Sequence, residues 1–237
     1  MVLEIEAILY LSLELLHDSA LMRIFSSVDR KYFIPNSYLE NPLDVYMDAP
    51  HYIGFNATIS APHMACTDSI KLVIACISAI PNARATFTPQ LQSIRHRIWF
   101  GSINSPFLFP IYQNGRTIGI DHIPELVSQS ISNVAESGHK ALLDGNVLEF
   151  LVADGRDGYA MESPYDVIHI GAGVSELPGK IVSQLKPNGI LVAPIGPEGH
   201  QIFQVITKIS QQKVTTKTIT AVRYIPLTSA NGQLANR

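Results

Sequence analysis

The chain has 237 residues, 46 % of them hydrophobic and 16 % charged, which is ample for one globular α/β domain and too little for two full ones. A formal net charge of −3 and scattered Lys and Arg residues give no basic stripe, so no nucleic-acid partner is expected. Cys66 and Cys76 are the only cysteines and form no CxxC pair, so neither a disulfide framework nor a metal site is expected.

The N-terminal part, 1–80, begins with an apolar stretch at 9–16 that is too short to cross a bilayer. Glu4 and Glu6 stand where a signal peptide would have basic residues. We therefore expect a soluble cytoplasmic protein that does not contact a membrane. Helical apolar spacing extends over 5–27, and the prolines that follow indicate an irregular segment, the kind of region that often contacts substrate.

A second helix is predicted to start at Ser60-Ala61-Pro62 and to continue to about Ala79. Beyond residue 115 the pattern changes to alternating strands and helices, a βαβ core over 115–228. The expected strands are 116–120, 147–152, 165–170, 190–195, 203–209 and 214–225, and the expected helices are 123–137 and 181–185. Such alternation predicts a mostly parallel sheet with helices on both faces. We interpret 1–237 as a single domain.

Acidic residues stand at the ends of two of these strands. Asp121 closes one strand and Asp154 closes the next. In an open α/β sheet the ligand binds at the carboxyl ends of the strands, where an acidic side chain can bind both ribose hydroxyls of a nucleotide-like cofactor. Asp121 could equally cap the helix that starts near Ile123. From spacing alone the two interpretations of Asp121 are about even.

Several blocks, in order along the chain, resemble the protein-L-isoaspartate O-methyltransferase family. The long block from Ile53 to Met64 is specific to that family. The other blocks are Val28-Asp29-Arg30, Tyr46-Met47-Asp48, Gly119-Ile120-Asp121-His122-Ile123, Asp154-Gly155-Arg156, Pro164-Tyr165-Asp166-Val167-Ile168-His169, Gln184-Leu185-Lys186-Pro187-Asn188-Gly189 and Pro226-Leu227-Thr228.

The resemblance implies a Rossmann-like methyltransferase fold that uses S-adenosyl-L-methionine. It implies methyl transfer to the free carboxylate of L-isoaspartyl and D-aspartyl residues in damaged proteins, as part of protein repair. The partners it implies are isoaspartyl-containing peptides and proteins, and we expect a monomer. A carboxylate with a pKa of roughly 4 is already ionised at neutral pH, so the reaction needs positioning more than a base.

Site residues follow from the resemblance position by position. Ser60 resembles the active-site serine, which orients the substrate carboxylate. Asp121 resembles the acid that binds ribose, and the pair Asp154 and Gly155 resembles the adenine contacts. The loop that closes over the cofactor corresponds to Ile53, Gly54, Phe55 and Asn56.

Three further points come from the same comparison. Asn56 replaces the family's usual glutamine, which shortens the reach of the side chain. Thr228 and Gln233 match late cofactor contacts by spacing. His63 and His169 lie in matching blocks without an obvious chemical duty, so we expect structural roles, and Lys186-Pro187-Asn188-Gly189 is expected to be a turn.

One segment, 85–114, departs from the family. A strand that ends in a glycine-rich turn belongs there, but Gly101 is its only glycine, and Pro106 and Pro110 interrupt the helix that should follow. A shifted reading frame over Ile94 to Ser102 is compatible with the missing motif, which favours an error in the gene model over natural divergence. Either way, the alternative function is a catalytically impaired relative or a peptide-binding protein.

Overall fold

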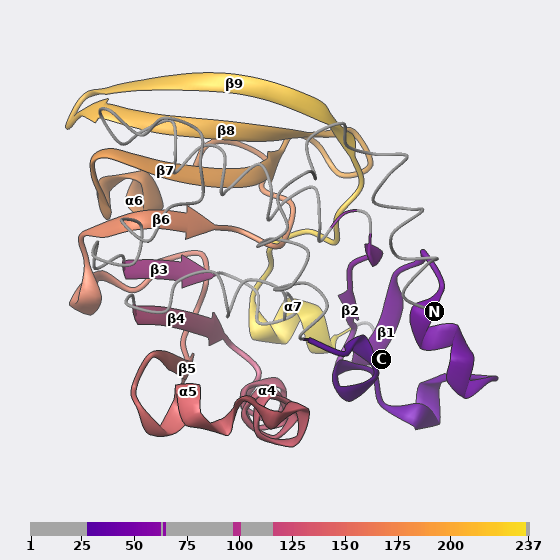
Figure 1. Cartoon of the computed structure of the whole chain (residues 1–237). Helices are drawn as coiled ribbons and strands as arrows, with labels where there is room; N and C mark the ends of the chain where they lie inside the picture. Colours follow the sequence, from indigo (N-terminus) through magenta and orange to yellow (C-terminus); the bar gives the residue numbers. More distant parts are fainter. Residues whose placement is uncertain (1–27, 63, 65–96, 101–115, 236–237) are drawn as a thin grey trace, which may run out of the picture.

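The computed structural model describes residues 28–62, 64, 97–100 and 116–235 of the chain (Figure 1). A seven-stranded sheet with the order β5-β4-β3-β6-β7-β8-β9 dominates this part. In this order the strands β5, β4, β3, β6 and β7 are parallel to one another. Strands β8 and β9 are added antiparallel at the β7 edge. The strands are β3 (Arg97–Phe100), β4 (Arg116–Asp121), β5 (Leu148–Val152), β6 (Tyr165–His169), β7 (Leu185–Ile195), β8 (Gln201–Ser210) and β9 (Lys213–Val222). The predicted mostly parallel sheet is confirmed.

Strand β3 falls inside the atypical segment 85–114. It pairs in parallel with β4 on one side and with β6 on the other, so it lies in the middle of the sheet. The family resemblance places a strand in this segment, and the segment does supply a central strand of the sheet. The remainder of the segment, and with it the place of the missing glycine turn, lies outside the described residues.

Helices connect the strands on both faces of the sheet. Helix α4 (Pro124–Val134) begins with a proline at its first position, where the missing N–H costs nothing. A π-helical turn (Ala135–His139) and α5 (Lys140–Asp144) follow it, and α6 (Gly179–Ser183) precedes β7. The predicted helices 123–137 and 181–185 correspond to these elements. The predicted helix 5–27, and all but the start of the one from Ser60, lie outside the described residues.

The core divides into two clusters on opposite faces of the sheet. Leu148 and Phe150 of β5 pack with α4 in the first cluster, and the alternate residue Leu151 packs against the second. Because successive side chains of a strand point to opposite faces, α4 and α6 cover opposite faces of the sheet. The second cluster includes Ile181 of α6 and the strand residues Ile118, Ile120, Ile168, Leu191 and Ile206.

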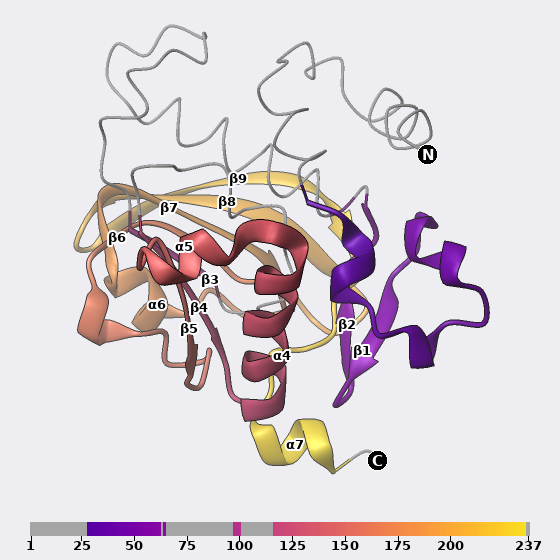
Figure 2. The same ribbon diagram turned by 60° about the horizontal axis from the view of Figure 1, so that its bottom comes forward.

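The N-terminal described part is a small cap beside this sheet. It consists of the 3₁₀ turns η1 (Arg30–Phe33), η2 (Asn36–Tyr38) and η3 (Pro42–Tyr46), followed by the hairpin β1 (His51–Gly54) and β2 (Ala57–Ile59). Helix α4 lies between this hairpin and the β4–β5 edge of the sheet (Figure 2). The chain returns at its C-terminal end through α7 (Ala230–Leu234), and the short η7 (Ala160–Glu162) precedes β6.

The stretch Lys186-Pro187-Asn188-Gly189 lies within β7 and not between two elements. Tyr165 and Val167 of β6 are two residues apart, whereas their partners in β7, Leu185 and Ile190, are five residues apart. The extra residues of β7 therefore form a bulge. Asn188 has a φ of 63°, and a Cβ added to Gly189 would lie 2.9 Å from the Lys186 carbonyl. The predicted turn is thus a local irregularity of a longer strand. Among the described helices, none is long and apolar enough to span a membrane.

Candidate functional site

A cavity of about 770 Å³ opens at the carboxyl ends of the central strands. Its volume lies within the range of roughly 300–1,000 Å³ that small-molecule sites occupy. Asp121 and His122 reach it from the end of β4, Gly155 from the loop after β5, and Gly171 from the end of β6. The remaining wall consists of Pro50, Asn56, Ala57, Thr58, Ser60, Ala61, Met64, Ala172, Glu198, Gly199, Ala221, Val222, Arg223, Tyr224, Ile225, Pro226, Leu227, Thr228 and Gln233.

Asp121 caps the turn before α4 and also lines the cavity. Its Oδ1 accepts a hydrogen bond from the Ile123 backbone N–H at 2.9 Å, which holds the turn before α4. The same side chain lines the cavity. Burial raises the pKa of Asp121 above its ordinary value, although the hydrogen bond from Ile123 acts in the opposite direction. Hydroxyl donors on a ligand would stabilise a carboxylate that is kept from bulk water in this way.

The turn of the β1–β2 hairpin presents Asn56 to the cavity. Phe55 and Asn56 have φ angles of 53° and 56°, as a two-residue type I′ turn requires, and asparagine tolerates this conformation better than most residues. Ile53 is buried in the core, Phe55 packs against it, and Gly54 lies against the Tyr38 ring. Of the four predicted loop residues, only Asn56 therefore lines the cavity, and the others shape the hairpin.

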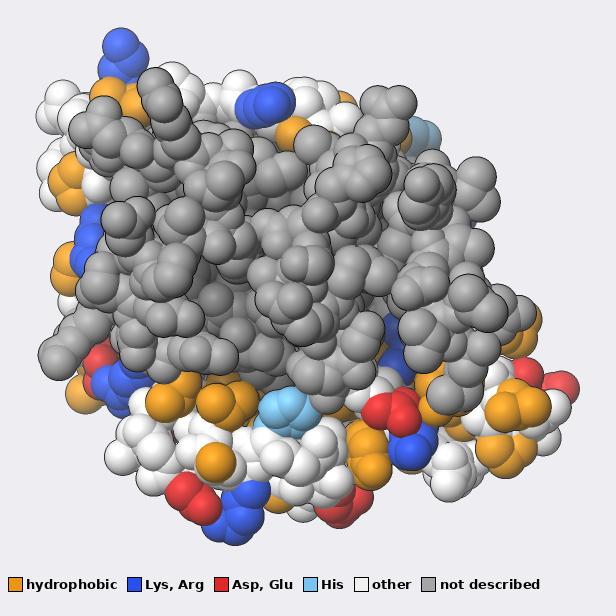
Figure 3. Space-filling view, in the orientation of Figure 1, with side chains coloured by type: hydrophobic (Ala, Val, Ile, Leu, Met, Phe, Trp, Pro, Cys, Tyr) orange, Lys and Arg blue, Asp and Glu red, His pale blue; other side chains and the backbone are white. Residues whose placement is uncertain are grey.

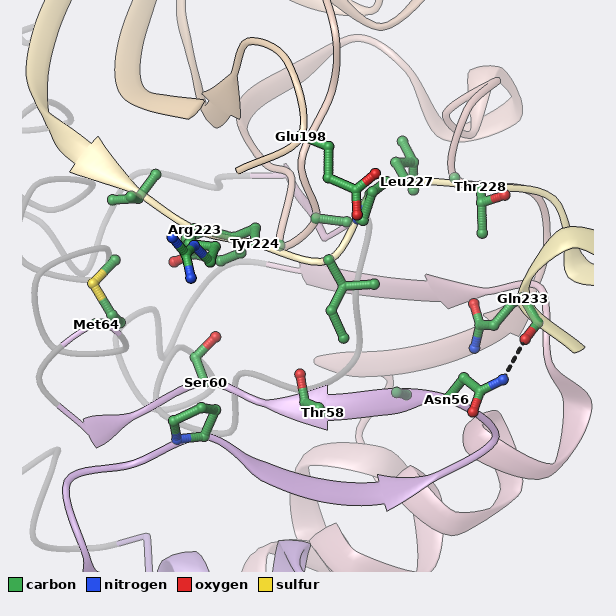
Figure 4. A pocket seen from close by; sticks show the side chains of 18 of the residues that line it. Asn56, Thr58, Ser60, Met64, Glu198, Arg223, Tyr224, Leu227, Thr228 and Gln233 are labelled. Atoms are coloured by element: carbon green, nitrogen blue, oxygen red, sulfur yellow. Dashed lines mark hydrogen bonds between the residues drawn. The ribbon is translucent and has the colours of Figure 1, made fainter. Parts of the chain in front are cut away.

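Two hydrogen bonds join this hairpin to α7, and a third joins α7 to His122 at the end of β4. The Asn56 amide donates from Nδ2 to the Gln233 carbonyl at 2.6 Å, and Gln233 Nε2 donates to the Phe55 carbonyl at 2.7 Å (Figure 4). Gln233 Oε1 lies 2.9 Å from His122 Nε2. Since Nε2 of Gln233 is already the donor to Phe55, its Oε1 accepts and His122 carries a proton on Nε2. We call Asn56, His122 and Gln233 the clasp.

Ser60 follows β2 directly and lines the cavity. The buried Arg30 holds the backbone here, because its guanidinium donates to the Ser60 carbonyl at 2.6 Å and to the Ala49 carbonyl at 3.0 Å. Arg30 belongs to a block that the sequence comparison singled out, and its contact is with the main chain of the serine. The main chain at Ser60 is thus held in position by a buried charged side chain.

The predicted adenine pair is divided in the structure. Gly155 lines the cavity, whereas Asp154 does not, and the Asp154 carboxylate accepts hydrogen bonds from Arg156 at 2.6 to 3.1 Å. These bonds lower the pKa of Asp154. The loop itself is fixed by the buried Gln184, which donates to the Asp157 carbonyl at 2.7 Å and accepts from the Tyr159 N–H at 2.9 Å.

Thr228 and Gln233, predicted from spacing alone, both line the cavity. A Cβ added to Gly232 would lie 2.6 Å from the Thr228 hydroxyl oxygen, so the glycine lets α7 approach Thr228. Ser229 caps α7 by accepting from the Gly232 N–H at 3.1 Å. These contacts bring Thr228 and Gln233 to the same cavity as Asp121.

Five charged or polar residues of the cavity wall were not predicted as site residues: Thr58, His122, Glu198, Arg223 and Tyr224. His122 stands inside a recognised block, and its position next to Asp121 is a signal that could have identified it. Arg223 is an isolated base after the last strand and carries no such signal. His169 is 2 % exposed within β6 and is not among the residues that line the cavity, in keeping with the expected structural role, whereas His63 lies outside the described residues. Within the described ranges, no cluster of side chains suited to a metal ion occurs.

Comparison with known proteins gives consistent matches. The model of the family "Protein-L-isoaspartate(D-aspartate) O-methyltransferase" matches residues 11–76 and 107–232. The gap between these matches overlaps the atypical segment 85–114. A protein-L-isoaspartate O-methyltransferase from Triticum aestivum is 36 % identical over 211 residues, covering 89 % of this chain and 84 % of the relative. One from Caenorhabditis elegans is 33 % identical over 211 residues, with 87 % and 84 % covered.

Solved structures share the fold. A Plasmodium falciparum structure assigned to the same enzyme class, in complex with S-adenosyl-L-homocysteine, superposes with a TM-score of 0.74 at 23 % identity. The superposition covers 96 % of this chain and 97 % of that one. A second structure, a protein-L-isoaspartate O-methyltransferase, gives a TM-score of 0.71 at 18 % identity.

Proposed function

The chain belongs to the protein-L-isoaspartate(D-aspartate) O-methyltransferase family and is therefore a methyltransferase, and we propose that it methylates L-isoaspartyl and D-aspartyl residues in damaged proteins. The methyl donor in this proposal is S-adenosyl-L-methionine, and the acceptor is the free carboxylate of the altered residue. The observation that carries the proposal is the shared cavity, which Asp121, Thr228, Gln233 and Ser60 all line.

The residues present fit the proposed cofactor. The half-buried Asp121 carboxylate at the end of β4 is suited to accept from two ribose hydroxyls. Thr228 adds a hydroxyl, Gln233 lines the same cavity, and Gly155 lies in the wall after β5 without a side chain. Bound there, the cofactor would supply a methyl group activated by its positive sulfur. The Asp154 carboxylate already accepts hydrogen bonds from Arg156. In the proposal it would have to accept a further hydrogen bond from the adenine amine.

The reaction asks the chain mainly to position its substrate. A carboxylate with a pKa of about 4 is ionised at neutral pH, so no general base is required. In the proposal, the Ser60 hydroxyl donates to one carboxylate oxygen and leaves the other free to attack the methyl carbon. Arg30 supports this geometry through the Ser60 carbonyl. Exclusion of water by the closed hairpin strengthens these contacts.

A second candidate function has one specific observation in its favour. The sequence that follows β3 contains no glycine-rich motif, and the family match is interrupted over 77–106. The candidate is a catalytically impaired relative, or a peptide-binding protein that does not turn over the cofactor. Cofactor affinity and turnover, measured separately, discriminate it from the enzyme.

The experiment measures transfer of labelled methyl from S-adenosylmethionine to a synthetic isoaspartyl peptide, with the aspartyl peptide of the same sequence as control. We expect label in the isoaspartyl peptide alone. Calorimetry with S-adenosylhomocysteine gives cofactor affinity on the same preparation. Binding without transfer would favour the impaired relative, and the absence of binding would contradict cofactor use by this chain.

A further inference from the structure

The cavity has two ends of different character. Asn56, Thr228 and Gln233 lie in one half of the close-up view, and Ser60, Met64 and Arg223 lie in the other (Figure 4). The first half contains Asn56 and Gln233 of the clasp together with Thr228, and Thr228 and Gln233 are assigned above to the cofactor. The second half contains the serine assigned to the methyl acceptor. Arg223 is thus at the acceptor end of the cavity.

The backbone that carries Arg223 is anchored on its C-terminal side. Gln201, 2 % exposed, donates to the Tyr224 carbonyl at 3.1 Å and accepts from the Tyr224 N–H at 2.7 Å. Gly173 donates to the Ile225 carbonyl at 2.9 Å and accepts from the Leu227 N–H at 2.7 Å. A Cβ added to Gly173 would lie 2.3 Å from Gln201, so the glycine is required for this arrangement. The cation at 223 therefore projects from a fixed main chain.

Arg223 has no ion-pair partner among the residues that the structure describes. The carboxylates that line the described cavity wall, Asp121 and Glu198, form no ion pair with it. A guanidinium keeps its charge at any physiological pH and offers a planar fork of donors that matches a carboxylate. An exposed cation in the half of the cavity that also contains Ser60 is suited to an anionic ligand.

Resting on the proposed function, we infer that Arg223 binds the carboxylate of the isoaspartyl substrate and determines selectivity for the free acid. Moving a carboxylate from water into the cavity costs free energy, and a cation at its destination offsets part of that cost. Ser60 and Arg223 would hold the same group from two elements far apart in sequence. Methylation removes the negative charge, so the ester product loses this interaction and is released more readily than the substrate is.

The test compares Arg223→Gln and Arg223→Lys with the unaltered full chain, and Lys217→Gln serves as the matched control. Lys217 is an exposed cation of β9, the strand that directly precedes Arg223, and it does not line the described cavity, so its replacement removes the same charge from outside the cavity. The probes are an L-isoaspartyl hexapeptide and its analogue in which the free carboxylate is a carboxamide. Binding is measured by calorimetry with S-adenosylhomocysteine present, and KM and kcat are measured for the isoaspartyl peptide.

We expect Arg223→Gln to weaken binding of the isoaspartyl peptide about tenfold, the lower range for hydrogen bonds to charged groups, and to raise KM by a similar factor. Arg223→Lys should lose less affinity for the isoaspartyl peptide, because lysine keeps the positive charge but lacks the planar pair of donors of the guanidinium. Affinity for the carboxamide peptide and for S-adenosylhomocysteine should not change in either variant. Lys217→Gln should behave as the unaltered chain.

Two results would overturn the inference while leaving the proposed function intact. Arg223→Gln could bind the isoaspartyl peptide as tightly as the unaltered chain, or it could lose affinity for both peptides equally. If the unaltered chain binds S-adenosylhomocysteine but neither peptide, the proposed substrate and this inference both fail.

Discussion

Asn56 and Gln233, 177 residues apart in the chain, are joined by a hydrogen bond of 2.6 Å from the Asn56 amide to the Gln233 carbonyl. The bond connects the turn of the first hairpin to the last described helix. Together with the hydrogen bonds between Gln233 and Phe55 and between Gln233 and His122, this bond closes one side of the cavity. Removal of these contacts is expected to open the site without unfolding the sheet, because none of them belongs to the strand ladder.

The clasp is expected to contribute to cofactor binding. Gln233→Ala removes the side-chain bonds to Phe55 and His122 and should weaken binding of S-adenosylhomocysteine by up to about thirtyfold, as for two hydrogen bonds of about 1 kcal/mol each. His122→Ala should have a smaller effect. A double-mutant cycle over His122 and Gln233, read by calorimetry, should show coupling of about 0.5 kcal/mol or more. Strict additivity would contradict the clasp, and Gln212→Ala in the β8–β9 turn is the control.

Asp121→Asn should separate stability from binding. Burial raises the pKa of the Asp121 carboxyl, so the ionised form opposes folding at neutral pH. Asparagine removes that charge and keeps an acceptor for Ile123, so the free energy of unfolding of the cofactor-free protein should rise. Affinity for S-adenosylhomocysteine should fall at least about tenfold, because charge-assisted hydrogen bonds are lost. Denaturant unfolding and calorimetry measure the two quantities, and unchanged affinity would remove Asp121 from the site.

Cofactor affinity should depend on pH through the same group. The ionised carboxylate accepts hydrogen bonds from hydroxyls, and the protonated form does not accept them equally well. Because the folded pKa lies above the ordinary value of 3.8, affinity should decline as pH falls through that higher value, before an ordinary aspartate titrates. Titrations with S-adenosylhomocysteine over a pH series measure this decline. A decline of equal size in Asp121→Asn would assign it to another group.

Ser60→Ala should reduce methyl transfer with little effect on the cofactor. The hydroxyl is proposed to hold the substrate carboxylate, and a hydrogen bond to a charged group is worth about 1.5–3 kcal/mol, or roughly ten- to a hundredfold in rate. Ser60→Thr retains the hydroxyl and should keep a larger share of the activity. Methyl transfer to the isoaspartyl peptide and affinity for S-adenosylhomocysteine are measured side by side. A Ser60→Ala variant as fast as the parent would exclude this role.

The chain as written should be slower than a version that carries a glycine-rich turn after β3. Methyl transfer depends on an in-line arrangement, and misplacement by about 1 Å can cost on the order of a hundredfold. The two versions are compared in transfer of labelled methyl to the isoaspartyl peptide. Equal rates would mean that 85–114 contributes to a working cofactor site in its present form. The nucleotide sequence over Ile94 to Ser102 shows independently whether an adjacent frame encodes the turn.

Sequence alone determined the order and type of most elements beyond residue 115. The strands at 116–121 and 165–169 were found because short apolar runs record burial on both faces of a sheet. The positions of Asp121 and Asp154 at strand ends follow from the same pattern. These features depend on neighbours in the chain, and periodicity and composition report such local information directly.

The tertiary structure decided the rest. Strand β3 is four residues long and was not predicted, since it is specified by its pairing with β4 and β6. The Asp154 carboxylate binds Arg156 and does not line the cavity. Arg223 lines the cavity, and Gln201 anchors the main chain beside it at Tyr224. The Asn56–Gln233 bond joins side-chain and main-chain atoms across 177 residues. No local pattern encodes such contacts, because they exist only after the hairpin, the strand ends and α7 have packed around one cavity.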